Sequence, residues 1–544
     1  MPITDELKRE IGQHFVFGFH GFEVSQNIKK IIEKYHVGNV ILMKRNIQSA
    51  AQTRKLVLDL QKIAKDARHE KPLLIGIDQE NGLVSAFSSP TAGTTFPGAM
   101  ALAATGSPEL AEKVAYASAS ELKMVGINWV YSPVADVNTD SRNPVIGVRS
   151  FGDDPNAVAM FATAVSHGTI AAGVAPTAKH FPGHGDTHVD SHLALPVIAK
   201  TRAQIGTEEL VPFAALVSAG VPSVMTGHMA LPLITGDDTP CSLSRKITTD
   251  LLRGEMGFEG VIVTDCLEMD AIAEGRGIRV GAEMALGAGA DVVMICHTFE
   301  RHVEAVEGVY EAVEAGRISV DELRASGERI RRMKMLFAEG DGDHEDWEAL
   351  FNKLHDESLK LSHETYPKST TIVWNGGGVI PLNVQHVLLL TPRMEAVNRA
   401  VDPGDGTLLG PNGVRNTAGA AYLALANSVG KRAQVEHVVY SQNGKIPVDL
   451  LDGVEGVIFV MRNADLSKWQ LEYLVRLGLR SRGVPVILMS SCGPYDLAGQ
   501  RVQFEDWTGY VATYEFTAEG LEAGVEVVFG EKEGTGMVPV ILSD

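Results

Sequence analysis

Eight short apolar runs recur within the first 340 residues of this 544-residue chain, and amphipathic stretches separate them. Each run is rich in Val, Ile, Leu or Phe and lies between glycine or proline breaks or helical patterns, as a buried parallel strand does. Because parallel strands need helical crossovers, eight such units predict a (β/α)₈ barrel; a doubly wound open sheet is the alternative. The runs cover residues 14–21, 38–46, 72–80, 128–136, 174–181, 222–229, 260–265 and 290–297.

Polar residues end nearly every one of these runs, which favours the barrel over the open sheet. In a barrel the carboxyl ends of the strands converge on one mouth, where barrel enzymes carry their chemistry. We therefore expect a functional site at that mouth. The polar residues that end the runs are His20, Lys44, Arg45, Asp78, Asp136, Lys179, His180, His228, Asp265 and His297.

A second α/β domain follows the barrel. Residues 338–369 are highly charged and are predicted to form a linker and a helix, after which apolar runs resume. We predict an α/β protein in three parts: a TIM-like barrel at 1–340, a linker and helix at 341–368, and a C-terminal α/β sandwich domain at 369–544. The runs assigned to the second domain are 386–392, 455–461, 484–490 and 509–514.

The charge balance and the cysteine count narrow the function class. The chain carries 48 basic and 68 acidic residues, a formal charge of −20. Phosphate backbones repel so acidic a chain, so we expect no nucleic-acid partner, although a local basic pocket would still suit a small anion. No apolar run is close in length to a membrane span, which takes about 20 residues. The first residues of the sequence lack the apolar core of a signal peptide. Four scattered cysteines are too few for a disulfide framework, and we expect a cytoplasmic protein without a membrane partner.

The densest polar cluster is KHFPGHGDTHVDSH, residues 179–192. Histidines recur there at every fourth residue, a spacing that on a helix would stack them on one face as in a zinc site. Pro182, Gly183 and Gly185 break a helix near its start, so we expect a loop above a barrel strand and no metal. A structural zinc site and simple solvated histidines are the alternatives. The four histidines are His180, His184, His188 and His192.

Asp190, His192 and Asp265 supply what hydrolysis of an acetal needs. A carboxylate two residues from an imidazole can hydrogen-bond it, fix its tautomer and hold its pKa near the working pH. Asp265 ends the run VIVTD, where a carboxylate can face the mouth as a nucleophile or base, or cap a helix that follows the strand. A carboxylate and a proton donor across one mouth suit cleavage of a glycosidic bond.

At these residues the chain resembles the β-N-acetylglucosaminidase branch of family 3 glycoside hydrolases, whose signature the 179–192 stretch matches. The resemblance covers nearly the whole chain, and further motifs follow in the family's order. These are GIDQENG (76–82), SPVADVN (132–138), VRSFGDDP (148–155), MTGHM (225–229), VTDCLEM (263–269), IPLN (380–383), PYDL (494–497) and FGEKEGTGMVPV (529–540).

The resemblance implies a barrel followed by an α/β sandwich, and a retaining double-displacement mechanism. By motif position, Asp265 would form a glycosyl-enzyme intermediate, and His192, paired with Asp190, would be the general acid/base. The other sugar contacts that it implies are Asp78 on distal hydroxyls, Arg149, Lys179 and His180 on ring hydroxyls, and His228 along the pocket wall.

The predicted function is therefore an exo-acting β-N-acetylglucosaminidase, of the β-N-acetylhexosaminidase type, with a small carbohydrate substrate and no metal or other cofactor. One alternative is a phosphorylase with phosphate as acceptor, since a neutral histidine does not repel an anion as a carboxylate would. Others are a relaxed enzyme that also accepts β-glucosides, a metal-dependent hydrolase, and a silent sugar-binding protein on the same fold.

Two arginines of the family pattern are replaced in this chain. Bacterial cell-wall-recycling members tend to read DQEGGRV with a second arginine close behind, whereas Leu83 and Ala86 stand at these arginine positions here. The departure favours a chitobiose-type or glycoconjugate fragment at least as much as a muropeptide.

Overall fold

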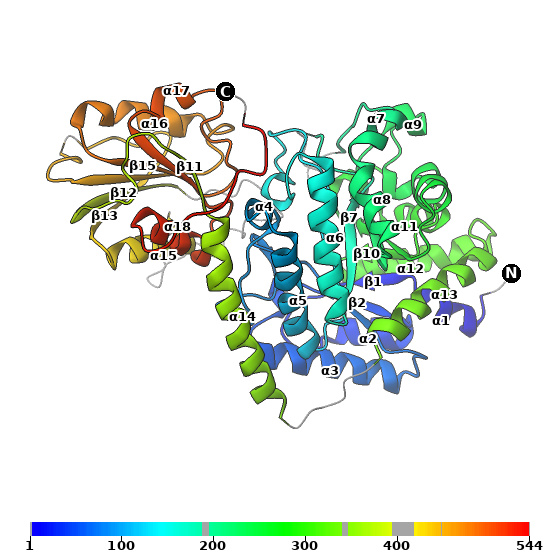
Figure 1. Ribbon diagram of the computed structural model, residues 1–544. Helices are drawn as coiled ribbons and strands as arrows, with labels where there is room; N and C mark the ends of the chain where they lie inside the picture. Colours follow the sequence, from blue (N-terminus) through cyan, green and yellow to red (C-terminus); the bar gives the residue numbers. More distant parts are fainter. Residues whose placement is uncertain (1–2, 188–194, 340–345, 394–417, 448, 543–544) are drawn as a thin grey trace.

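The computed structural model describes residues 3–187, 195–339, 346–393, 418–447 and 449–542, and it contains a closed barrel of eight parallel strands (Figure 1). Each of the eight predicted runs holds one barrel strand, so the predicted barrel is confirmed and the open sheet is excluded. The strands are β1 (Phe15–Phe17), β2 (Asn39–Leu42), β3 (Leu74–Ile77), β6 (Trp129–Val130), β7 (Ala175–Phe181), β8 (Ser223–Thr226), β9 (Val261–Cys266) and β10 (Val292–Ile295).

The barrel closes because β1 pairs with both β2 and β10, in the order β1-β10-β9-β8-β7-β6-β3-β2. Every strand contributes at least one fully or nearly buried side chain to an apolar interior. The neighbouring side chains along each strand pack outward against the helices instead. Because both faces of the strands are buried, their sequences read as continuous apolar runs rather than as alternating ones. The interior side chains include Val16, Ile41, Leu74, Trp129, Ala175, Met225, Val263 and Met294.

Helices cover the outside of the barrel. Ser107 caps the amino-terminal end of α5, where its side chain accepts a hydrogen bond from the Leu110 backbone. Among the described residues, no helix is both long and apolar enough to cross a bilayer. The helical elements are α1 (Asp5–Gly12), α2 (Gln26–Lys34), η1 (Lys44–Asn46), α3 (Ala50–Asp66), α4 (Ala99–Ala104), α5 (Pro108–Met124), η2 (Gly147–Arg149), α6 (Pro155–Ala171), α7 (Arg202–Thr207), α8 (Leu210–Ser218), α9 (Pro232–Thr235), η3 (Cys241–Leu243), the π-helical η4 (Lys246–Glu255), α10 (Asp270–Ala273), α11 (Ile278–Gly287), α12 (Phe299–Glu314) and α13 (Val320–Phe337).

The second domain is an α/β sandwich built on a six-stranded sheet in the order β11-β16-β15-β14-β12-β13. Only β11 at one edge runs antiparallel to its neighbour. Separate apolar clusters fill the two sides of this sheet, one with α15 and α18 and the other with α16 and α17. The elements are β11 (Thr371–Asn375), β12 (His386–Pro392), α15 (Gly419–Gly430), β13 (Gln434–Tyr440), β14 (Gly456–Met461), α16 (Trp469–Arg476), η6 (Leu479–Arg482), β15 (Val486–Ser490), α17 (Arg501–Phe504), β16 (Thr508–Ala512) and α18 (Ala518–Val528).

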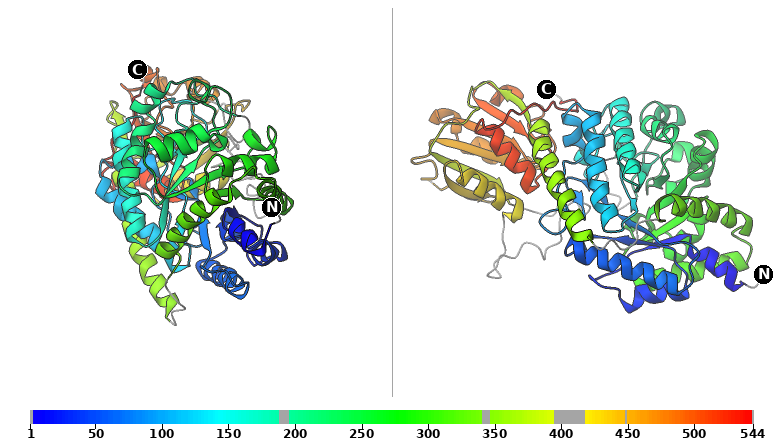
Figure 2. Two further views of the ribbon diagram at one scale, coloured as in Figure 1. Left: turned by 90° about the vertical axis from the view of Figure 1, so that its right-hand side faces the viewer. Right: turned by 60° about the horizontal axis from the view of Figure 1, so that its bottom comes forward.

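The long helix α14 (Trp347–Ser369) joins the two domains, running along the outside of the barrel to the edge of the second domain (Figure 2). It packs against α4 and α5 of the barrel and α18 of the second domain. The buried carboxylate of Glu515 reinforces this junction, accepting hydrogen bonds from the Gly98 backbone at 2.8 Å and the Tyr366 hydroxyl at 2.7 Å. Desolvation by burial raises the pKa of Glu515 to about 7. The second domain is therefore fixed to the barrel by specific polar contacts as well as by apolar packing.

The close packing of α5 on α6 generates a stability prediction. A methyl group added to Gly168 on α6 would lie 2.2 Å from the Glu112 backbone oxygen on α5. Gly168→Ala gains about 1 kcal/mol of helix propensity, but overpacking costs about 1–3 kcal/mol, so we expect a lower thermal unfolding midpoint. Gly287→Ala on α11 is the matched control, because no atom lies within 4 Å of its added methyl. A higher midpoint for Gly168→Ala than for the native chain would contradict the tight α5–α6 contact.

Candidate active site

A cavity of about 560 Å³ opens at the carboxyl ends of the barrel strands. It gathers side chains from the ends of β3, β7 and β9 and from the loops that follow β3, β6, β9 and β10. Five of the eight residues predicted for the site line this cavity: Asp78, Arg149, Lys179, His180 and Asp265. The position is the one expected for a barrel enzyme.

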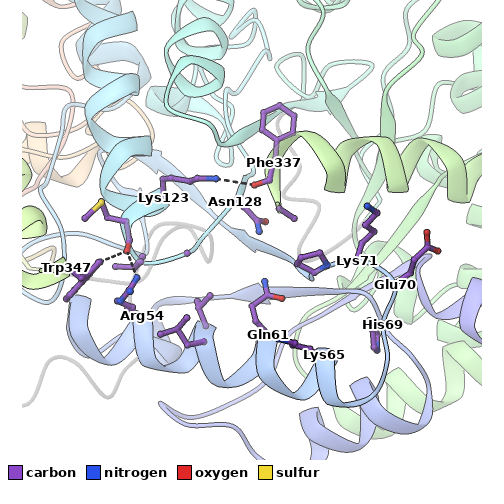
Figure 3. A pocket seen from close by; sticks show the side chains of 17 residues that line it. Arg54, Gln61, Lys65, His69, Glu70, Lys71, Lys123, Asn128, Phe337 and Trp347 are labelled. Atoms are coloured by element: carbon purple, nitrogen blue, oxygen red, sulfur yellow. Dashed lines mark hydrogen bonds between the residues drawn. The ribbon is translucent and has the colours of Figure 1, made fainter. Parts of the chain in front are cut away.

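A larger cavity of about 680 Å³ lies at the other end of the barrel, where β3 and β6 begin (Figure 3). Its lining polar groups mostly serve the fold. Lys123 donates to the Phe337 carbonyl, and Trp347 and Arg54 both donate to the Met124 carbonyl. The amino-terminal end of a barrel carries stability rather than chemistry, so we assign the active site to the smaller cavity.

A buried ion network built on Glu80 supports one wall of the candidate site. Glu80 lies on β4 (Gln79–Asn81), which forms a short hairpin with β5 (Val84–Ser85) directly after β3. Its carboxylate accepts two hydrogen bonds from Arg149, at 2.8 Å from Nε and 2.7 Å from Nη2. Lys179 Nζ lies 2.7 Å from the same carboxylate and 2.9 Å from Asp78 Oδ1. One carboxylate thus orients two of the predicted sugar-binding cations.

The electrostatics of this network keep all three groups charged. Burial alone would raise the pKa of Glu80, but Arg149 and Lys179 more than offset it and hold that pKa at about 2. Burial likewise opposes the charged forms of the two cations. The carboxylate of Glu80 raises the pKa of Arg149, and those of Asp78 and Glu80 raise the pKa of Lys179. A role for Glu80 was not predicted, although it lies only two residues beyond the strand-ending Asp78.

A second buried carboxylate, Asp136, orients His180. The ring Nδ1–H of His180 donates to Asp136 Oδ2 at 2.7 Å, and Asp136 Oδ1 accepts the backbone N–H groups of His180 and His184. Burial would raise the pKa of Asp136, but His180, followed by His184, holds it below the ordinary value. In the neutral ring, Nε2 of His180 is then the acceptor, and it lies 3.5 Å from Arg149 Nη2. Burial lowers the pKa of His184 to about 4, so that ring is neutral at pH 7.

Asp265 stands next to the end of β9 and lines the cavity. Its Oδ1 accepts the backbone N–H of Cys266 at 2.7 Å. A partly exposed carboxylate at the carboxyl end of a barrel strand can contact a sugar bound in the cavity. Asp190 and His192, the predicted acid/base pair, lie outside the described residues.

His228, predicted to lie along the pocket wall, is not among the described residues that line the cavity. The side chain is fully buried two residues beyond the end of β8. Its Nε2 donates to the Cys266 carbonyl at 3.0 Å, and its Nδ1 lies 2.8 Å from the Ser242 hydroxyl. With both ring nitrogens bonded within the protein, His228 supports the backbone that follows Asp265. The sequence placed it at a strand end but did not indicate which side of the wall it occupies.

Leu83 and Ala86, which stand where the family pattern has arginines, both line the cavity. Leu83 also packs against the apolar cluster of the second domain that contains Phe516 and Leu521. The hairpin that carries Glu80 is therefore held between the cavity and the second domain. An arginine at position 83 would bring a charge into this apolar contact.

The chain is similar to known proteins in both sequence and fold. The sequence model described as "Glycosyl hydrolase family 3 N terminal domain" matches residues 6–333. "Beta-hexosaminidase A" of Pseudoalteromonas piscicida is 34% identical over 67% of this chain and 64% of its own length. The structure of a fungal multi-domain GH3 β-N-acetylglucosaminidase is 35% identical, with a TM-score of 0.87 over 99% of this chain and 61% of that one. This chain thus spans just under two thirds of the length of each of these two relatives. The family 3 β-N-acetylglucosaminidase of Paenibacillus sp. str. FPU-7 is 33% identical, with a TM-score of 0.86 over 99% of both chains.

The buried ion network predicts a large effect of Glu80→Gln on stability. Removing the shared carboxylate leaves Arg149 and Lys179 without their main buried partner, which costs about 3–5 kcal/mol. Because folding lowers the pKa of Glu80 from 4.5 to about 2, its contribution is fully present above pH 4.5 and is lost as the pH falls towards 2. The difference between native and variant chains in the free energy of unfolding should therefore narrow over that range.

Chemical denaturation at several pH values measures this difference. Glu304→Gln, on the exposed face of α12, is the matched control and should change stability by less than about 0.5 kcal/mol. Equal stability of Glu80→Gln and the native chain at neutral pH would contradict the proposed importance of the network.

Proposed function

This chain belongs to glycosyl hydrolase family 3, and from that premise we propose that it is an exo-acting β-N-acetylglucosaminidase. It releases terminal, non-reducing β-linked N-acetylglucosamine with retention of configuration. The observation that carries the proposal is the position of Asp265 at the end of β9, in one cavity with the sugar-binding candidates Asp78, Arg149, Lys179 and His180. The names of the relatives, β-hexosaminidase and β-N-acetylglucosaminidase, support the same substrate class.

The proposed reaction has two displacements. In the first, a carboxylate oxygen of Asp265 attacks the anomeric carbon, and the bond to the aglycone oxygen breaks as that oxygen takes a proton from His192. In the second, His192 takes a proton from water, whose oxygen attacks the anomeric carbon and releases Asp265. Asp190 accepts a hydrogen bond from the imidazole and stabilises its charged form.

The network around Glu80 prepares the sugar-binding wall before substrate arrives. Lys179 and Arg149 are held by carboxylates, so neither loses conformational freedom when a hydroxyl binds. Asp78 accepts from a sugar hydroxyl through its partly exposed carboxylate. His180 presents Nε2 to the same region, because Asp136 fixes the opposite ring nitrogen.

The charge of the cavity favours water over phosphate as the acceptor. When Asp265 is esterified in the intermediate, four acidic side chains remain among the described lining residues against three basic ones, and this excess disfavours an incoming phosphate. We therefore propose hydrolysis, with phosphorolysis as the alternative that the same assay tests. The acidic residues are Asp78, Glu80, Asp265, Glu268 and Asp270, and the basic ones are Lys44, Arg149 and Lys179.

The domain division and the compartment are part of the proposal. Residues 1–340 are the catalytic barrel, 341–368 the linker and helix, and 369–544 a domain that braces the hairpin beside the cavity through Leu83. A cytoplasmic location is supported by the four cysteines, which are buried and too few for a disulfide framework.

Initial rates on aryl β-N-acetylglucosaminide and aryl β-glucoside, each with and without phosphate, test the proposed function. We expect a strong preference for the N-acetyl sugar and no sugar 1-phosphate. Comparable rates on the two sugars would indicate a pocket with relaxed specificity. Formation of a sugar 1-phosphate would show that the reaction is phosphorolysis rather than hydrolysis. No turnover of either sugar would leave the sugar-binding protein as the better reading.

Asp265→Asn should lower turnover by on the order of 10⁴–10⁶-fold, the scale seen when a nucleophilic unit is dismantled. The amide keeps the size of the side chain, so the thermal unfolding midpoint should stay close to that of the native chain. Mass spectrometry after reaction with a 2-fluoro sugar should find a covalent adduct on the native chain only. An active Asp265→Asn chain would remove Asp265 as the nucleophile.

His192→Ala should cost roughly 10²–10⁴-fold in rate on a substrate with a poor leaving group, because that oxygen needs a proton. The loss should shrink on an aryl glycoside whose leaving group is stable as an anion. A plot of rate against leaving-group pKa measures both effects. An equal loss on all leaving groups would count against His192 as the acid.

A further inference from the structure

Three side chains that the proposed reaction does not use converge on one side of the cavity. Cys266 ends β9, Glu268 follows it by two residues, and His297 comes shortly after β10. One ligand atom from each, the thiol sulfur, a carboxylate oxygen and a ring nitrogen, all lie within 4.8 Å of one another. All three residues line the cavity. Within the part of the chain that the structure describes, no other three His, Cys, Asp or Glu residues approach so closely.

The chemistry of this donor set points to a zinc-like ion. Sulfur, imidazole nitrogen and carboxylate oxygen are the ligands that Zn²⁺ takes, whereas Mg²⁺ and Ca²⁺ prefer oxygen alone. Zinc bonds of about 2.0–2.3 Å in a tetrahedron place the ligand atoms about 3.5 Å apart. The observed spread of up to 4.8 Å therefore needs a contraction of roughly 1 Å, which side-chain rotation supplies.

The carboxylate of Glu268 is already held for such a role. Its Oε2 accepts the backbone N–H of His297 at 2.6 Å, and its Oε1 accepts that of Thr298 at 3.1 Å. These bonds join the loop after β10 to the loop after β9, so they keep His297 beside Glu268. Each carboxylate oxygen retains a lone pair, and hydrogen-bonded carboxylates are the usual form of carboxylate metal ligands.

Two guanidinium groups lie near the cluster and oppose a cation there. Arg301 Nη1 lies 3.5 Å from Glu268 Oε1. Arg45 donates to the backbone carbonyls of Cys296 and Phe19 at 2.6 and 3.0 Å, so it does not pair with Glu268 at hydrogen-bond distance. The thiolate formed by Cys266 on binding adds a second negative charge beside Glu268, and together the two offset the guanidinium charges.

We propose that Cys266, Glu268 and His297 form a binding site for Zn²⁺ in the wall of the cavity, with the fourth coordination position open to the cavity. The site is not part of the reaction; occupied, it is inhibitory. Cys266 directly follows Asp265, so a divalent ion there attracts the Asp265 carboxylate and takes up space that the sugar needs. The inhibition rests on the proposed function, whereas the binding does not.

Calorimetric titration of the full chain with zinc chloride, without substrate, tests the site. We expect one ion to bind, and Cys266→Ser, Glu268→Gln and His297→Ala each to weaken binding more than about tenfold, since even outer-shell changes cost about 10–100-fold. With Co²⁺ in place of zinc, the native chain should gain a thiolate-to-metal charge-transfer band that is absent from Cys266→Ser. His363→Ala, exposed on α14, is the matched control and should bind zinc as the native chain does.

The inhibition is measured as the ratio of the rate with zinc to the rate without it, separately for each variant. The ratio should fall for the native chain and for His363→Ala, and stay near one for the three ligand variants. Unchanged zinc affinity in the ligand variants overturns the proposal. That result is also expected if the ion binds the histidines of residues 179–192 instead. A chain that binds zinc through these ligands but hydrolyses neither sugar overturns the proposed function alone. Melting curves establish that each variant is folded.

Discussion

The carboxylate of Glu80 is the group on which the candidate site depends, because it joins three parts of the chain that are remote in sequence. It lies on the hairpin after β3, pairs with Arg149 from the loop after β6, and pairs with Lys179 at the end of β7. Taking three charges out of water is costly, and only close pairing among them offsets that cost. Close pairing of the three charges therefore holds this part of the cavity wall together. Asp136 is a second buried carboxylate that orients a site residue: it accepts a hydrogen bond from His180 and fixes the orientation of that ring.

The second domain completes this arrangement from outside the barrel. Leu83, in the same hairpin as Glu80, packs into the apolar cluster of that domain. Asn138, in the loop after β6, donates to the Tyr495 hydroxyl at 3.1 Å, and the Ile541 backbone near the C-terminus donates to Asp153 at 2.7 Å. Two of the loops that carry site residues are thus supported by residues more than 300 positions later in the chain. The second domain thus contacts the loops that carry the site residues.

The sequence predicts those parts of the fold in which every side chain of a strand meets the same, apolar surroundings. The barrel strands are apolar on both faces, and β12 was predicted with its observed ends, 386–392. The edge strands β11 and β13 were not predicted, because partly exposed edges such as Gln434–Tyr440 mix polar and apolar residues. Strand ends located Asp78, Lys179 and Asp265 at the cavity. The role of Glu80 and the buried place of His228 depend on partners from distant segments, and no local pattern carries that information.

The junction between the domains also bears on how the chain is made. Helix α4 of the barrel contributes Met100, Ala101 and Ala104 to an apolar cluster whose other members include Tyr495, Tyr514 and Val540. These partners come from the last fifty residues of the chain. At about 5–20 residues per second, a ribosome needs roughly 10–40 s to pass from the end of the barrel to that region. Throughout this interval the apolar side chains of α4 lack the partners that cover them in the folded protein, so this surface of the barrel is prone to aggregation until the second domain is made.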